Sequence, residues 1–259
     1  MSRGFGVTAG LDPEIASPLA ARCRELGYTS MWSNDHPEAK GLETLADYAK
    51  GADRIDLGIT VAIDRRSAEE VASDIERLDL DRGRLWLGLG AGVTEKPLTA
   101  MREALPGLRD ALPGIRLALL AMGPKMSAFG GAEWDGVFFN WMTPEFAVQA
   151  RDWVEGGASE AGREPPPIFG YVRTAVGADA EGRLAKDEAF YRDLQQGYRR
   201  HFDRQGAPEG TVGVAAENAG VAQEELSRYR ALDTVVVRAL ASAKFEDMSA
   251  LAEAATPGV

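Results

Sequence analysis

Short apolar runs alternate with amphipathic stretches along the whole chain. Each run is continuous rather than alternating between apolar and polar positions, as strands buried on both faces require. Eight such runs lie at 5–9, 30–33, 56–62, 84–90, 115–121, 136–140, 166–177 and 233–240. We therefore predict eight strands that are buried on both faces.

Stretches of helical period follow these runs, at 13–26, 43–53, 67–80, 97–112, 124–134, 144–161, 179–205, 221–230 and 243–254. Eight strands that alternate with helices favour an α/β fold, a (β/α)8 TIM barrel, and we expect residues 1–259 to form one such domain. A doubly wound open sheet is the alternative. We favour the barrel because no predicted strand is followed by the GxGxxG pattern.

Composition narrows the possible partners. The chain has 259 residues and a formal net charge of −11, which argues against nucleic acid and against an anionic membrane surface. Cys23 is the one cysteine, so no internal disulfide can form. The first ten residues lack an apolar signal core, and no run reaches the roughly 18 apolar residues of a membrane span. We expect a cytoplasmic protein that acts on a small molecule.

The two histidines differ in their surroundings. His36 directly follows the second predicted strand, beside Asp35, where a barrel presents its active side chains. A histidine there can move a proton near neutral pH, and the alternative is a loop residue that fixes the turn before Pro37. His201 lies in the charged stretch YRRHFDR, and we expect it to be solvated at the surface.

Several other predicted strand ends carry candidate ligand-binding groups. Asn34 can bond a ligand ring or form a turn, and Arg65 and Arg66 suit an anion or the plain surface. The glycines of GLGAG at 88–92 permit close backbone approach to a ligand, or a tight turn. The segment AMGPKM at 121–126 opens a helix, whose amides bind phosphate. Asn140 and Trp141 end the sixth strand, and the tryptophan either covers a flat ring or packs beneath the following helix.

Other chemistries find no support in the sequence. It contains no HExxH or CxxC pattern and too few histidines for a His-rich metal site. The GxSxG turn that exposes a serine nucleophile is also missing. Metal hydrolysis and nucleophilic catalysis are therefore poor hypotheses.

Taken in order, three segments resemble the luciferase-like monooxygenase superfamily. They are ARCRELGYTSMWSNDHP, RSAEEVASDIERLDLDRGRLWLGLGAG and LAMGPKMSAFGGAEWDGVFFNWMTPE. The last is most similar to the branch that uses the deazaflavin coenzyme F420. The resemblance covers residues 5–155 well and the rest mainly through the last strand.

The resemblance implies a barrel that binds coenzyme F420, or alternatively FMN, at the carboxyl ends of its strands. His36 and Asp35 match the catalytic pair of the family. Val61 and Ala62 match a strand end that often forms a cis bulge behind the cofactor ring. The remaining matches are Gly90, Ala91 and Gly92 near the cofactor side chain, and Gly123, Pro124, Lys125 and Met126 at its phosphate. Asn34 and Asn140 complete the expected cofactor contacts.

One feature departs from the family pattern. Only about 22 residues separate GLGAG from IRLALLA, where the family usually has a long insertion over the substrate pocket. An open mouth excludes water poorly, which suits hydride transfer better than oxygenation. We therefore expect an F420-dependent oxidoreductase, by family a homodimer. The alternatives are an FMN-dependent monooxygenase with a partner flavin reductase, and a flavin-binding barrel without turnover.

Overall fold

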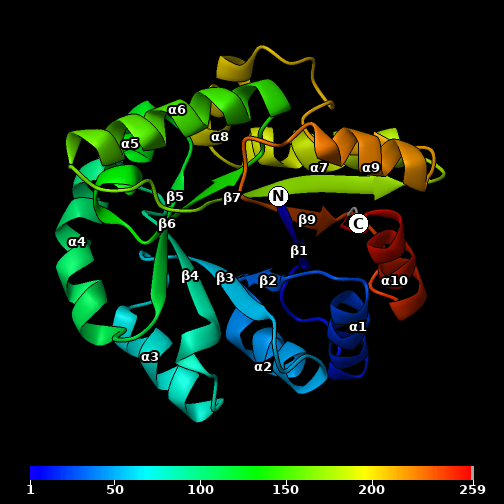
Figure 1. Cartoon of the computed structure of the whole chain (residues 1–259), viewed down its shortest axis with the longest axis horizontal. Coiled ribbons are helices and arrows are strands. Elements are labelled where there is room, and N and C mark those ends of the chain that lie inside the picture. The colour runs from blue at the N-terminus through cyan, green and yellow to red at the C-terminus, as the bar shows by residue number, and fades with distance from the viewer. Residues whose placement is uncertain (258–259) are drawn as a thin grey trace.

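The computed structural model describes residues 1–257, and eight of its nine strands close into a parallel barrel (Figure 1). Neighbours in sequence pair from β1 to β7, and β9 lies between β7 and β1. The (β/α)8 barrel predicted from the apolar runs is confirmed. The barrel strands are β1 (Ser2–Gly6), β2 (Ser30–Asn34), β3 (Asp56–Ala62), β4 (Leu85–Gly90), β5 (Arg116–Ala121), β6 (Gly136–Asn140), β7 (Ile168–Val176) and β9 (Thr234–Ala239).

Ten helices surround the strands in the described chain. Proline is the first residue of four of them, a position where its missing N–H costs nothing. A capping box of Ser67 and Glu70 opens α3. The helices are α1 (Pro13–Glu25), α2 (Gly41–Gly51), α3 (Ala68–Arg77), α4 (Pro97–Ala111), α5 (Pro124–Glu133), α6 (Pro144–Glu160), α7 (Ala180–Leu194), α8 (Gln196–Gln205), α9 (Ala219–Ser227) and α10 (Phe245–Ala254).

Three details differ from the predicted elements. The long helix expected at 179–205 is two helices, because Gln195 is extended between α7 and α8. A three-residue strand, β8 (Val214–Ala216), pairs with the end of β7 and is too short to show as an apolar run. β1 begins three residues earlier than expected, and Val7 only continues its pairing toward β2.

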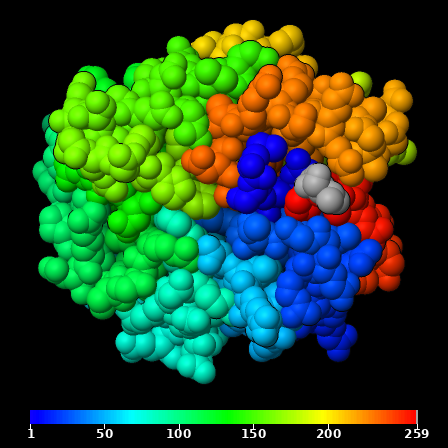
Figure 2. Space-filling view, in the orientation of Figure 1, coloured from blue at the N-terminus to red at the C-terminus, as the bar shows by residue number. Residues whose placement is uncertain are grey.

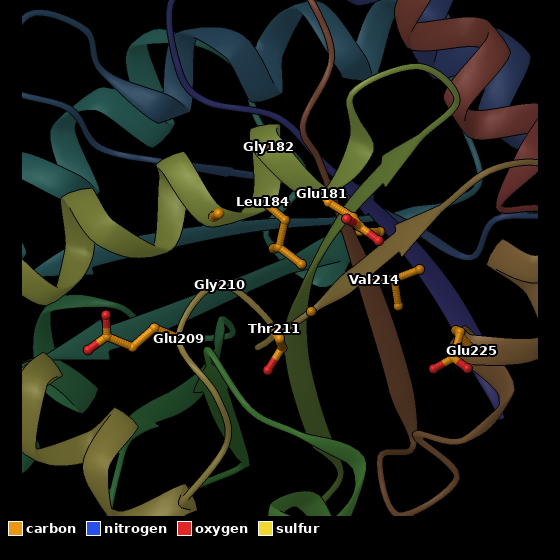
Figure 3. Close-up of a pocket in the computed structure, with 11 residues that line it drawn as sticks. Glu181, Gly182, Leu184, Glu209, Gly210, Thr211, Val214 and Glu225 are labelled. Atoms are coloured by element: carbon orange, nitrogen blue, oxygen red, sulfur yellow. The ribbon is translucent and has the colours of Figure 1, made fainter.

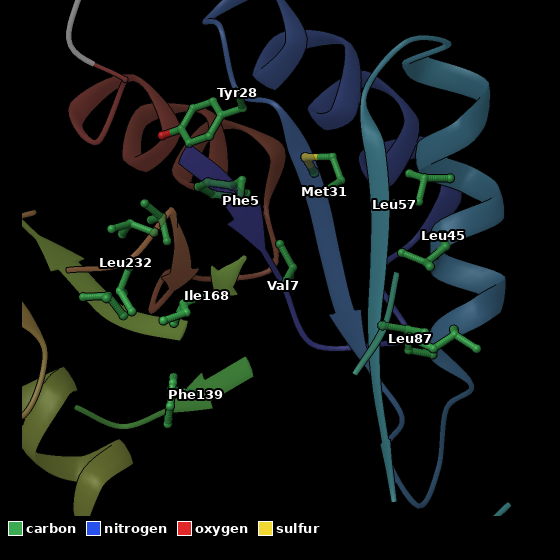
Figure 4. Packing of buried hydrophobic residues seen from close by; sticks show 14 of the residues in the cluster. Phe5, Val7, Tyr28, Met31, Leu45, Leu57, Leu87, Phe139, Ile168 and Leu232 are labelled. Carbon is green, nitrogen blue, oxygen red and sulfur yellow. The ribbon is translucent and has the colours of Figure 1, made fainter. Parts of the chain in front are cut away.

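The strands carry two separate sets of buried side chains. Strand residues that face outward pack against the helices, as Leu57 of β3 does beside Leu45 of α2 (Figure 4). Residues that face inward fill the barrel, and Trp32 and Phe138 lie at its centre with ring centroids 4.7 Å apart. The interior of the barrel is therefore a packed core, and a ligand can bind only at an end of the barrel.

Close helix packing fixes the turn that opens α5. A Cβ at Gly131 would lie 2.0 Å from the carbonyl oxygen of Val154, and one at Gly157 would lie 2.0 Å from that of Ala128. Only glycine allows α5 and α6 to approach so closely. This contact holds the beginning of α5 in place at the end of β5.

The connection from β4 to β5 contains α4 as its one helix, so the short connection expected from the sequence is confirmed. The first residues of the chain lie beside the orange and red C-terminal segments on the face shown in Figure 2, where the strands begin. Among residues 1–257, no helix is long and apolar enough to cross a membrane.

Candidate functional site

The carboxyl ends of the parallel strands form one mouth of the barrel. Side chains alternate along each strand, so residues two positions beyond the interior cluster point into this mouth. By this rule Asn34 follows Trp32 on β2 and Asn140 follows Phe138 on β6. Arg173 follows Tyr171 on β7, and Arg238 follows Val236 on β9. The mouth therefore carries two guanidinium groups and two amides.

Arg238 spans the mouth between β9 and the first two strands. Its side chain is 7% exposed, and its Nη2 donates to Thr8 Oγ1 at 2.6 Å and to Asn34 Oδ1 at 2.7 Å. Its guanidinium carbon lies 5.3 Å from the ring centre of Tyr171. Burial raises the pKa of Tyr171, so this phenol stays neutral beside the cation.

Arg173 connects the mouth to the helices above it. It is 2% exposed, and its Nε donates to the carboxylate of Asp187 on α7 at 3.3 Å. Its Nη1 donates to Asn140 Oδ1, and its guanidinium carbon lies 4.2 Å from the ring of Trp141. Asn140 in turn donates to the hydroxyl of Tyr198 at 3.2 Å. Neither arginine was among the residues predicted from the sequence, although a charged residue near the end of a buried apolar strand is a usable signal.

His201 is buried, so the prediction that it is solvated at the surface is wrong. Only 1% of it is exposed. Its Nδ1 lies 3.1 Å from the carbonyl oxygen of Met122, and its Nε2 lies 3.0 Å from that of Asn140 and 2.5 Å from that of Trp141. Burial lowers its pKa although these carbonyl oxygens oppose the shift. His201 thus fastens α8 to the ends of β5 and β6.

The predicted phosphate turn lies beneath the same helix. Gly123 caps α5 without a side-chain hydrogen bond, and Lys125 is exposed at the beginning of that helix. Arg204 of α8 donates to the carbonyl oxygen of Met122 at 2.7 Å, and its Nη1 lies 3.1 Å from where a Cβ of Gly123 would be. The guanidinium of Arg204 therefore lies beside the free backbone amides at the N-terminus of α5. This cation was not predicted from the sequence.

Asp35 and His36, the predicted catalytic pair, have different surroundings. Asp35 accepts from the amide of Gly41 at 2.8 Å and from Arg66 at 3.1 Å, and Arg66 also bonds Asp74 at 2.5 Å. His36 is exposed, and its Nδ1 accepts from the amide of Glu38 at 3.3 Å. Asp35 therefore anchors the loop that carries His36, and the two side chains form no hydrogen bond with each other.

The remaining predicted cofactor contacts lie along β3 and β4. Val61 is 2% exposed and faces the helices, whereas Ala62 is partly exposed and pairs with Gly90 in the next strand. No peptide bond of residues 1–257 is cis, so the cis bulge expected from the family is not present at Val61 and Ala62.

The turn after β4 is built around Gly92. Its φ is +68°, and a Cβ there would lie 1.9 Å from Oδ1 of Asp64, whose carboxylate also accepts from the amide of Val93. The close approach of Asp64 and the positive φ therefore explain the glycine at 92 without a ligand. Ala91, its neighbour, is partly exposed at the mouth.

Trp141 is a packing residue, as one of the two alternatives predicted, but it packs beneath α7 and α8 and not beneath α6, the helix that follows it. It is 1% exposed and clusters with Leu184, Phe202 and Val212. Its φ is +57°, a conformation that costs a bulky residue energy and is common at functional sites. With this backbone conformation, the carbonyl oxygen of Trp141 points toward His201 and the side-chain amide of Gln205.

A hollow of about 560 Å³ lies beside the barrel, between α7, β8 and α9 (Figure 3). Glu181, Glu209 and Glu225 are among its lining residues, and a second hollow of about 380 Å³ adjoins it. Neither includes a residue of the barrel mouth, and we place the candidate site at the mouth because the buried cations and amides converge there. Within residues 1–257 no cluster of three or more His, Cys, Asp or Glu residues is arranged to hold a metal ion.

Solved structures share this fold over the whole chain. The coenzyme F420-dependent tetrahydromethanopterin reductase from Methanopyrus kandleri has a TM-score of 0.77 at 17% identity, covering 100% of this chain and 98% of that chain. An F420-dependent secondary alcohol dehydrogenase in complex with an F420–acetone adduct has a TM-score of 0.72 at 15% identity, covering 99% of each chain.

An FMN protein is similar as well. The oxygenating constituent of 3,6-diketocamphane monooxygenase from Pseudomonas putida, in complex with FMN, has a TM-score of 0.67 at 12% identity, covering 100% of this chain and 99% of that chain. The sequence matches no protein-family model and no curated protein. The fold of this chain is therefore that of F420-dependent reductases and FMN monooxygenases, as the resemblance in the sequence led us to expect.

Proposed function

We propose that this protein is an oxidoreductase that transfers a hydride between coenzyme F420 and a small organic substrate. The observation that carries the proposal is the turn at 123–126. There the unpaired amides of the α5 N-terminus stand beside the guanidinium of Arg204, and both attract phosphate. The similarity in fold to F420-dependent enzymes supports the choice of cofactor.

The residues of the mouth suit this group. Gly123, Pro124, Lys125 and Met126 would hold its phosphate, and Asn34, Ala62, Gly90, Ala91 and Asn140 would line the space for its ring and side chain. Bound there, the coenzyme would supply a ring that accepts or gives a hydride. Val61 and Gly92 would contact the coenzyme through their backbone atoms alone, because the Val61 side chain faces the helices and Asp64 packs against Gly92.

His36 would act on the substrate oxygen through Nε2. Since Nδ1 accepts a hydrogen bond from Glu38, the neutral ring carries its proton on Nε2. A neutral histidine in this state donates a hydrogen bond to an oxygen that gains negative charge. Asp35 would position it, because its bonds to Gly41 and Arg66 hold both ends of the loop.

Replacing Arg204 tests the proposed phosphate contact. Arg204→Gln removes one charge-assisted hydrogen bond, for which we expect about a tenfold loss of F420 affinity. Arg200→Gln, at another exposed arginine of α8, is the matched control and leaves the affinity unchanged. If both variants and the wild type bind F420 with equal affinity, the phosphate does not bind at this turn.

FMN is the alternative cofactor, and it would make the protein a monooxygenase with a partner flavin reductase. The FMN-bound structural neighbour favours keeping this alternative. We further propose a cytoplasmic homodimer. A single buried cysteine supports the location, and the resemblance to the family supports the dimer. Sedimentation of the purified protein tests the latter.

A further inference from the structure

The charges in the barrel mouth are not balanced. Arg173 has the carboxylate of Asp187 at 3.3 Å. Arg238 is bonded only to the neutral groups of Thr8 and Asn34, and no carboxylate of residues 1–257 lies within 4.0 Å of it. A buried charge without a counter-charge is costly unless something else compensates it.

The bonding of Arg238 is incomplete as well. Nη2 makes both of its hydrogen bonds, whereas Nη1 is buried and has no partner in the described chain. Buried polar side-chain atoms are normally satisfied, so an unsatisfied donor on a charged group at the mouth calls for a partner that the described chain does not supply. The unused donor belongs to a side chain that is 7% exposed at the inner rim of the mouth.

The two guanidinium groups belong to one surface. Arg173 and Arg238 are paired in register on β7 and β9. Their guanidinium carbons lie 5.8 Å and 5.3 Å from the ring centre of Tyr171. Like charges on adjacent strands repel, and among residues 1–257 Asp187 is the one carboxylate within 4.0 Å of either guanidinium. Asp35 is held by Arg66, so it is not free to supply the missing negative charge.

We infer that the mouth binds a carboxylate at Arg238, and that the substrate of the proposed oxidoreductase is therefore a small organic acid. The second statement rests on the proposed function, whereas the first does not. A planar carboxylate matches the fork of a guanidinium, and it would satisfy Nη1 and supply the missing charge together. The ionised ring of a reduced deazaflavin is also a planar anion, so the experiment must separate the two sources.

The test uses 2-oxo acids of three to six carbons and their neutral amides as probes, with binding measured by calorimetry. We expect at least one acid to bind the wild type about tenfold or more tightly than its amide. Arg238→Met abolishes that preference. Arg116→Met is the control, because Arg116 lies at the opposite end of the strands and is paired with Asp56 at 2.9 Å. It leaves the preference unchanged.

Separate titrations with F420 distinguish the possible failures. The inference is overturned if no acid is preferred over its amide, or if Arg238→Met weakens F420 binding and leaves acid binding intact. If the protein binds the acid but not F420, the carboxylate site is supported and the proposed F420-dependent function is refuted. Arg238→Lys retains the charge but loses the fork, so it should show a reduced preference even if Arg238→Met fails to fold.

Discussion

Replacing each histidine in turn separates stability from chemistry. His201→Ala removes a ring that is 1% exposed and contacts the carbonyl oxygens of Met122, Asn140 and Trp141. A neutral ring donates one hydrogen bond, whose net contribution is about 1 kcal/mol. Its packing against Phe146, at a ring distance of 5.2 Å, contributes about 1–2 kcal/mol more. We expect the free energy of unfolding to fall by about 2–3 kcal/mol.

Equilibrium unfolding in urea, followed by circular dichroism and tryptophan fluorescence, measures this loss. His36→Ala is the matched control, because an exposed loop histidine should change stability by less than about 0.5 kcal/mol. Under the proposed function, turnover should behave in the opposite way. His36→Ala lowers it with little loss of F420 affinity. If His201→Ala unfolds at the same urea concentration as the wild type, then α8 is not fastened by this residue.

Three further predictions concern pH, the loop that carries His36, and the turn after β4. Burial lowers the pKa of His201 below its unfolded value of about 6.5, so its contribution to stability is complete above that pH and is lost as the pH falls toward the folded pKa. Urea unfolding at pH 7.5 and 5.5 should therefore show a larger loss for the wild type than for His201→Ala, and equal losses would contradict it. Asp35→Asn removes a charge from a partly buried pair with Arg66, which keeps Asp74 as a partner, and should lower the free energy of unfolding by about 1–3 kcal/mol; a change below about 0.5 kcal/mol would show that the pair does not fix the loop. Gly92→Ala, at a φ of +68° and against Asp64, should lower the melting temperature, whereas Gly107→Ala, with open space around it in α4, should raise it slightly; the same shift in both would refute the strain.

The barrel was predictable because its signal is local. Strands buried on both faces must be continuous apolar runs, and each of the eight runs contributes a strand. The strand β8 escaped because Val214–Ala216 is stabilised by pairing with the overlong β7 and not by its own sequence. The break between α7 and α8 was not predicted because no proline lies near Gln195, and the nearest glycine, Gly197, lies inside α8.

The site was less predictable, because its groups come from distant parts of the chain. Asn34 and Asn140 could be placed from their positions at strand ends, and both lie at the mouth. His201 looked like a surface residue because its neighbours in sequence are charged. Its burial depends on carbonyl groups some 60 to 80 positions away, which no local pattern encodes.

The missed arginines show which signal was overlooked. Arg173 and Arg238 are the charged residues in the apolar runs GYVRTAV and TVVVRA, and inward positions of a barrel rarely hold an unpaired charge. A cation there is either neutralised inside the protein or used on a ligand. Among residues 1–257, Arg173 contacts the carboxylate of Asp187, whereas the hydrogen-bond partners of Arg238 are neutral.

The most direct test of the proposed function is a titration of the purified protein with coenzyme F420 and, separately, with FMN, followed by absorbance and fluorescence. We predict saturable binding of F420 with a dissociation constant of about 1–10 μM, weakened about tenfold by Arg204→Gln, and no comparable binding of FMN. Tight binding of FMN alone would make the monooxygenase the better hypothesis. Binding of neither would contradict the account and leave a barrel that does not use these cofactors.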